Sequence, residues 1–255
     1  MNYTAEELQA NYTMFLSYID LYITGDRKQQ LKQLYNDHAE RIMLMPASSI
    51  DHHHNAFPGG YIDHVIRVMD CALRLKDLWA SMGADINYTE EELIFAAMNH
   101  DLGKIGTEEA EQYQPNDSEW HRKNLGKLYK YNSANPFMPV PDRSLFLLQQ
   151  RGIKVSFNEY IAIKTHDGLY DQGNSPYFIS NSRESKLRTN LPILLHHADH
   201  MASRIEFEIW ENKKEGDGVA VKPRLIEKRT KPTIPADLSQ TEKDDLMNVF
   251  NNLFK

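Results

Sequence analysis

The pair His100-Asp101 closes an apolar helical stretch, within the sequence AMNHDLGK of residues 97–104. Burying an unpaired carboxylate costs several kcal/mol, so a fold that encloses Asp101 must supply a cation or a strong hydrogen-bonding partner. A divalent metal ion is the simplest partner that an imidazole and a carboxylate can share. The pair therefore requires a fold that brings further ligands to the end of this helix.

Length and composition are those of an ordinary soluble chain. Its 255 residues are enough for one large domain, or for one domain with appendages. No stretch approaches the ~18 consecutive apolar residues of a membrane helix, and the N-terminus is polar and acidic, unlike a signal peptide. The single cysteine, Cys71, excludes an internal disulfide. These features predict a cytoplasmic protein without a membrane partner.

The formal net charge of -7 argues against binding to duplex nucleic acid, because such binding needs a basic face. The charge does not exclude a small anionic substrate, since a bound metal reverses the local field whatever the overall charge. We therefore expect a small-molecule partner and no nucleic acid duplex.

Helix signals dominate the chain and predict an all-α fold. Capping boxes of the form S/T-x-x-E begin at Thr4, Thr89 and Ser156, each followed by apolar residues at helical spacing. A further long helix is expected from about residue 61 to Gly83, and another over about residues 190–210.

Composition divides the chain into three parts. Residues 1–45 are predicted to form an N-terminal helical extension and residues 46–212 a metal-binding domain, in which the proline-rich stretch 105–150 holds only short helices. Residues 213–255 begin as a charged arm and end in an amphipathic segment. Such a terminal helix docks on its own domain or forms a contact in a homodimer.

Two further helices carry His or Asp where apolar residues are expected. His64 shares its side of a helix with apolar residues, and Asp199 lies within an otherwise apolar helix. Neighbouring side chains on a helix diverge by about 100°, so one ion can bind both His100 and Asp101 only at a helix end, which Gly103 supplies. A lone inward histidine is usually a packed core residue. The four residues together indicate a metal site.

Three motifs in this order resemble the HD superfamily of metal-dependent phosphohydrolases, including members encoded by tailed phages. They are PGGYIDH, which ends at His64, HDLGK, which begins at His100, and HHAD, which ends at Asp199. The resemblance covers about residues 50–210 and implies a helical bundle around one or two divalent ions, bound by His64, His100, Asp101 and Asp199. The first motif is most similar to exoribonucleases that join an OB fold to an HD domain, but about 45 preceding residues are too few for an OB fold.

Members of the superfamily with two metals have two more histidines between the doublet and the last aspartate. The resemblance gives these roles to His121 and His166, with Asp101 bridging the two ions. His121 also fits a surface or substrate-contacting position in a loop, and the bridging role of Asp101 depends on it. Ligands of this type suit divalent Mn, Fe, Ni, Co or Mg. The segment that begins at His166 is similar to HD-GYP phosphodiesterases, but their Gly-Tyr-Pro signature is absent.

The remaining candidates would act on a substrate. Lys104, with Asp101, is expected to act in catalysis as a point charge on a phosphate oxygen, or else to be a surface lysine at a helix end. His53 and His54 precede the Gly-Gly turn and are candidates for phosphate contact or proton transfer, or belong to a solvated loop. The candidate substrate contacts are Arg143, Tyr170 and His196.

The resemblance implies metal-assisted hydrolysis of a phosphoester in a small nucleotide-like substrate. Two alternatives remain open. Some HD-fold proteins use a similar ligand set to hold two irons and cleave bonds with dioxygen, and others are non-catalytic sensors. A phage-encoded member would act in the host cytoplasm during infection.

Overall fold

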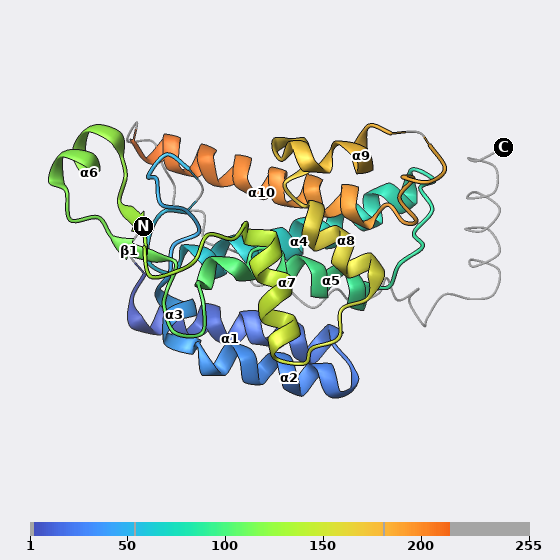
Figure 1. Cartoon of the computed structure of the whole chain (residues 1–255), viewed down its shortest axis with the longest axis horizontal. Coiled ribbons are helices and arrows are strands. Elements are labelled where there is room, and N and C mark those ends of the chain that lie inside the picture. The colour runs from blue at the N-terminus through green and yellow to red at the C-terminus, as the bar shows by residue number, and fades with distance from the viewer. Residues whose placement is uncertain (1–2, 54, 181, 215–255) are drawn as a thin grey trace, which may run out of the picture. The chain divides into compact units, whose positions relative to one another are not determined.

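The computed structural model describes residues 3–53, 55–180 and 182–214, all within one compact unit, Met1–Pro223. These residues confirm an all-α fold, in which the only strands form a two-stranded sheet (Figure 1). None of the described helices is long and apolar enough to cross a membrane. The elements in chain order are α1 (Ala5–Tyr22), α2 (Gly25–Asp37), α3 (Ala39–Leu44), α4 (Gly60–Ser81), α5 (Glu90–Asn99), η1 (Leu102–Ile105), β1 (Tyr113–Pro115), α6 (Glu119–Leu125), β2 (Tyr129–Tyr131), α7 (Val140–Gln150), α8 (Phe157–Thr165), η2 (Gly168–Tyr170), η3 (Gln172–Asn174), α9 (Ser175–Phe178) and α10 (Leu191–Lys214).

Capping boxes fix where α1, α5 and α8 begin. At Thr4, Thr89 and Ser156 the cap hydroxyl accepts the backbone N–H three residues on, and the glutamate there accepts the cap N–H in return. A good N-cap is worth about 1 kcal/mol. The predicted capping boxes are therefore confirmed. The two helices that begin at Thr89 and Ser156 end so that His100 and His166 occupy their C-caps.

Four helices form the centre of the fold. The last helix, α10, packs along α4 and α8, and α5 packs against the same two helices. The sides of these helices that face one another are mostly apolar, and a few buried polar side chains lie among the apolar ones. The N-terminal helices α1 and α3 pack on α4, on the side away from α10 (Figure 1). Residues 1–45 thus belong to the same compact unit as the central helices.

The stretch 105–150 holds structure that periodicity did not predict. Strands β1 and β2 pair antiparallel, with Tyr113 opposite Tyr131, and flank α6 in the chain. Strands of three residues are too short to show an alternating pattern. The helix α7 has 11 residues and is longer than expected for this stretch. Its N-cap is Pro139 and its one internal proline, Pro141, lies in the first turn, where the missing N–H is tolerated. The predicted arm and amphipathic helix lie outside the described residues from residue 215 on.

Candidate metal centre

Five histidine and aspartate side chains from the four central helices converge between them. His64 comes from the first turns of α4, His100 and Asp101 from the end of α5, His166 from the end of α8, and Asp199 from the middle of α10. Their ligand atoms form two overlapping groups, each within 4.8 Å, that share His100. Four of the five residues are buried, and Asp199 is half-buried. The structure therefore brings together residues that are 135 positions apart in the sequence (199 − 64).

The spacing of the ligand atoms fits a small cation. His64 Nε2 lies 3.2 Å from Asp199 Oδ1 and 3.6 Å from Asp101 Oδ2. His100 Nε2 lies 3.4 Å from Asp101 Oδ2, and His166 Nε2 lies 3.7 Å from Asp101 Oδ1. Ligand atoms that share an ion at about 2.1 Å lie about 3.0–3.4 Å apart. Small side-chain adjustments would therefore let the atoms of either group bind one divalent metal.

The three imidazoles are oriented as metal ligands are. His100 Nδ1 donates to the carbonyl of Ala97 at 2.7 Å, and His166 Nδ1 donates to the carbonyl of Ile163 at 2.8 Å. A carbonyl oxygen can only accept, so Nδ1 carries the hydrogen and the lone pair of each neutral ring is on Nε2. Among the described residues, the buried His100 Nε2 has no hydrogen-bonding partner. Fixing Nδ1 in this way directs Nε2 towards the cluster and is typical of histidines that bind metals.

A change of helix type lets His100 and Asp101 face one centre. The α-helix ends at Asn99, and the backbone tightens at Asp101 (φ -105°, ψ 10°) into the 3₁₀ turn η1. The turn packs against α7, where a Cβ at Gly103 would lie 2.3 Å from the carbonyl oxygen of Val140. The helix thus ends at Asn99, before the predicted end at Gly103, and the glycine permits the close approach of η1 to α7.

Opposite charges hold the centre in its ionised form. Burial raises the pKa of Asp101, but Lys104 and the surrounding histidines outweigh it and hold that pKa well below its usual range. Burial lowers the pKa of His64, but Glu206 and Asp199 outweigh it and raise that pKa to about 10. Without a metal, protons and the Lys104 ammonium supply the positive charge that the carboxylates require.

A cavity of about 400 Å³ opens on the cluster, and it is lined by Tyr170, a predicted substrate contact, and by Lys104, a predicted catalytic residue. Lys104 lies at its inner end, with Nζ 2.5 Å from Asp101 Oδ2. The Tyr170 side chain is 79% exposed, and its ring stacks on His200 with 6.0 Å between ring centres. The residues that line the cavity are Asp101, Lys104, Pro139, Val140, Pro141, His166, Asp167, Tyr170, Asp171, Gln172 and Asp199.

Arg143 and His196, the other two predicted substrate contacts, are not among the residues that line this cavity. The Arg143 guanidinium is buried and donates to the carbonyls of Gly103 and Pro136 and to the side chain of Gln112. These hydrogen bonds tie two loops to α7. His196 Nδ1 donates to the carbonyl of His166 at 2.8 Å, so His196 supports a ligand from behind.

His121 does not join the cluster. It is exposed on α6, and its ring packs on Trp120 with 5.3 Å between ring centres. It belongs to neither group of candidate ligand atoms among the described residues. The prediction of a second metal bridged by Asp101 depended on His121, and both groups of candidate ligand atoms form without it.

The loop histidines have different outcomes. His53 is exposed, and its pKa is lowered by partial burial, by His52 and by the charge of Lys104. Its ring packs on that of His52, with 4.8 Å between ring centres, and it is not among the residues that line the cavity. His54 lies outside the described residues.

Sequence reasoning missed one buried acid. Glu206 lies on α10, and its carboxylate contacts His64 Nδ1 at 3.1 Å. It follows Asp199 by seven residues, which is two helical turns and therefore the same face of the helix. That spacing was the available signal.

Comparisons with protein-family models, with curated proteins and with solved structures found no match for this chain. The centre is therefore characterised by its own geometry. Its distinguishing features are three imidazoles with fixed Nδ1 atoms, two carboxylates, and an adjacent lysine at the inner end of an open cavity.

Proposed function

We propose that this chain is a phosphohydrolase that uses one divalent metal ion to cleave a small phosphoester in a nucleotide-like substrate. The observation that carries the proposal is the position of Lys104, a buried ammonium group beside the candidate ligands at the inner end of the cavity. A divalent ion held by these ligands would polarise a phosphoryl oxygen and make a nucleophile available from water at neutral pH. A lysine next to such an ion suits a substrate that carries negative charge on oxygen.

The chain's own residues have separate tasks in this proposal. The five ligands hold the ion, and Lys104 offsets negative charge that develops on the phosphoryl oxygens. The exposed face of Tyr170 provides a surface on which a nucleobase can stack. The lowered pKa of His53 leaves its ring neutral at pH 7, so it is suited to accept a proton.

The charge of the cavity favours a substrate with a single phosphate group. Asp167 and Asp171 also line the cavity, with Asp167 Oδ1 3.7 Å from His166 Nε2, and Lys104 is the only lysine or arginine among the described residues that line it. A metal ion and Lys104 together would offset Asp101, Asp199 and part of one phosphate. Further phosphates would lie against Asp167 and Asp171, and like charges in contact are unfavourable. We therefore place monophosphates and diesters ahead of triphosphates.

A substrate screen with matched lysine variants tests the proposal. Nucleoside mono-, di- and triphosphates and cyclic nucleotides are incubated with wild-type protein and Mn, Co, Ni or Mg, and products are followed by phosphate release and chromatography. We expect metal-dependent hydrolysis, strongest for a monophosphate or diester, and a loss of at least ~10²-fold in Lys104→Gln. Lys123→Gln, on the exposed face of α6, is the control and should retain full activity.

Two results would contradict the proposal. One is the absence of hydrolysis with every metal and substrate class, together with oxygen consumption by an iron-loaded protein. The other is full activity in Lys104→Gln.

A further inference from the structure

Glu206 is a fully buried carboxylate that lies directly behind a candidate metal ligand. Its side chain is 0% exposed, and its two oxygens lie 3.1 and 3.3 Å from His64 Nδ1. A carboxylate accepts hydrogen bonds, so the ring donates Nδ1–H to Glu206. This contact leaves His64 Nε2 to face Asp101 and Asp199.

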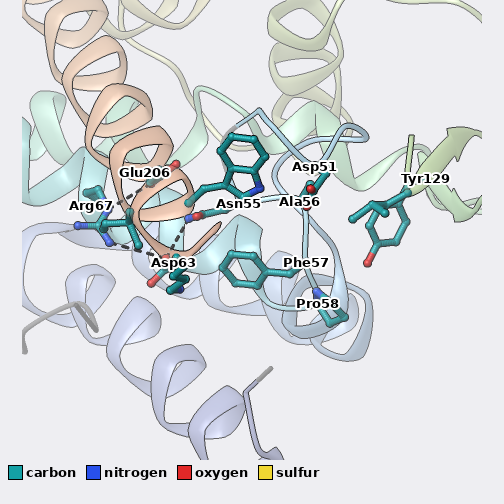
Figure 2. Close-up of a pocket in the computed structure, with 13 residues that line it drawn as sticks. Asp51, Asn55, Ala56, Phe57, Pro58, Asp63, Arg67, Tyr129 and Glu206 are labelled. Atoms are coloured by element: carbon teal, nitrogen blue, oxygen red, sulfur yellow. Dashed lines mark hydrogen bonds and ion pairs between the residues drawn. The ribbon is translucent and has the colours of Figure 1, made fainter. Parts of the chain in front are cut away.

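The surroundings of Glu206 hold it in place. Arg67 Nε donates to Glu206 Oε1 at 3.2 Å, and the Arg67 guanidinium lies 3.8 Å from Asp63. Asp63 in turn accepts hydrogen bonds from Tyr3 Oη at 3.0 Å and from Asn55 Nδ2 at 2.9 Å. Figure 2 shows Asp63, Arg67 and Glu206 together on one wall of a cavity of about 270 Å³. Burying a carboxylate without a partner would lower the stability of the fold. Arg67 supplies the partner of Glu206, and Asp63 holds Arg67, so Glu206 has a fixed position.

The other two imidazoles have neutral partners. His100 and His166 donate Nδ1–H to the backbone carbonyls of Ala97 and Ile163. Among the three candidate histidine ligands, His64 therefore has the only carboxylate partner on Nδ1. A carboxylate behind an imidazole increases the electron density on Nε2 and makes the ring a stronger metal donor.

We infer that Glu206 is a positioning residue of the metal centre, which fixes the His64 ring and strengthens its bond to the metal, while Arg67 fixes Glu206. The inference rests on the metal site of the proposed function, but not on the reaction that the site catalyses. A carboxylate attracts a doubly charged ion more strongly than a singly charged proton at the same position. Removing the charge of Glu206 lowers the affinity of the site for the metal more than it lowers the affinity of His64 for a competing proton, so net metal binding becomes weaker.

The test is a Co²⁺ titration of the full chain, followed by visible absorption and by competition with a chelator at pH 8. Loss of such a partner typically weakens metal affinity about 10–100-fold. We expect this loss in Glu206→Gln, with a shift of the Co²⁺ absorption bands and with unchanged helical content by circular dichroism. Glu208→Gln, on the exposed side of the same helix, is the matched control and should bind Co²⁺ within about twofold of wild type.

A second variant covers the case in which Glu206→Gln does not fold. Glu206→Asp keeps the charge but withdraws the carboxylate by one methylene, so we expect a smaller loss of Co²⁺ affinity and a smaller band shift. Wild-type affinity and an unchanged spectrum in either folded variant would overturn the inference, as would a wild-type chain that binds no Co²⁺. A wild-type chain that binds Co²⁺ but hydrolyses no substrate would overturn only the proposed function.

Discussion

Two of the groups of buried or half-buried carboxylates that the structure describes are neutralised in different ways. In the first, Arg27 Nη1 lies 2.8 Å from both oxygens of Glu159, and Nη2 lies 2.5 Å from Glu91. The guanidinium also lies over the ring of Phe95. In the second group, Asp101 and Asp199 face three imidazoles and one lysine.

The type of cation distinguishes the two groups. The Arg27 group has a permanent cation and serves the fold, whereas the group around Asp101 and Asp199 can exchange protons for a metal ion. A guanidinium stays charged at all accessible pH values, and its two terminal nitrogens here donate to Glu159 and to Glu91, so the Arg27 group is complete as it stands. Imidazoles can release their protons and offer lone pairs to an ion instead. The same residue class, buried carboxylate, thus contributes to stability in one region and prepares a metal site in the other.

Removing Asp101 should have the largest effect on function. Its two oxygens face His64, His100 and His166, so Asp101→Ala should abolish stoichiometric metal binding and lower hydrolysis by at least ~10²-fold. Elemental analysis of the purified protein and a hydrolysis assay measure the two effects. Asp117→Ala, at an exposed ion pair, is the control. Full metal content in Asp101→Ala would show that Asp101 is not a metal ligand, and the contrast between a structural ion pair and a metal site would fail.

Removing Arg27 should have the largest effect on stability. Arg27→Ala leaves the buried Glu159 without its cation, which should lower the free energy of unfolding by about 3 kcal/mol while metal affinity stays unchanged. Urea unfolding of the metal-free protein measures the loss. Arg74→Ala breaks an exposed pair on α4 and should cost less than about 1 kcal/mol. Equal losses in the two variants would show that the Arg27 group is not a structural element.

Lowering the pH should weaken metal binding but leave the Arg27 group intact. The raised pKa of His64, about 10, means that this ring is protonated in the metal-free protein at neutral pH, and a metal must displace the proton. Apparent affinity should therefore fall about tenfold per displaced proton for each unit of pH between 9 and 7. Co²⁺ titrations across this range measure the slope. An affinity independent of pH would contradict the role of His64 as a ligand.

Removing His121 should have the smallest effect. Because His121 is exposed on α6 and outside the cluster, His121→Ala should keep the metal content and the Co²⁺ affinity of wild type to within about twofold. His166→Ala is the informative partner, since it removes a ring that lies in the cluster and should weaken binding at least ~10-fold. A loss of metal in His121→Ala would restore the two-metal arrangement.

The sequence was most informative where local signals decide the outcome. Capping boxes correctly predicted the starts of α5 and α8, and these two helices end at His100 and His166. The apolar patterns of α4 and α10 correctly indicated that His64 and Asp199 point inward.

Long-range contacts were harder to predict. Which of the two histidines after the doublet reaches it depends on tertiary packing. The apolar helix before His166 favoured that residue, whereas a ligand role and a surface role suited His121 equally well. Arg143 has the residue type of an anion-binding side chain, but its partners are backbone carbonyls from distant loops that no local pattern specifies. Glu206 had a usable signal, its helical spacing from Asp199, but only the packing of α10 on α4 identifies His64 as its partner.

The most direct measurement is anomalous diffraction at the metal absorption edge from crystals of the Co²⁺-loaded protein. We expect one peak per chain, within bonding distance of Nε2 of His64 and His100 and of carboxylate oxygens of Asp101 and Asp199, with His166 completing the set. A peak elsewhere in the chain, or no peak between these side chains, would contradict the metal centre.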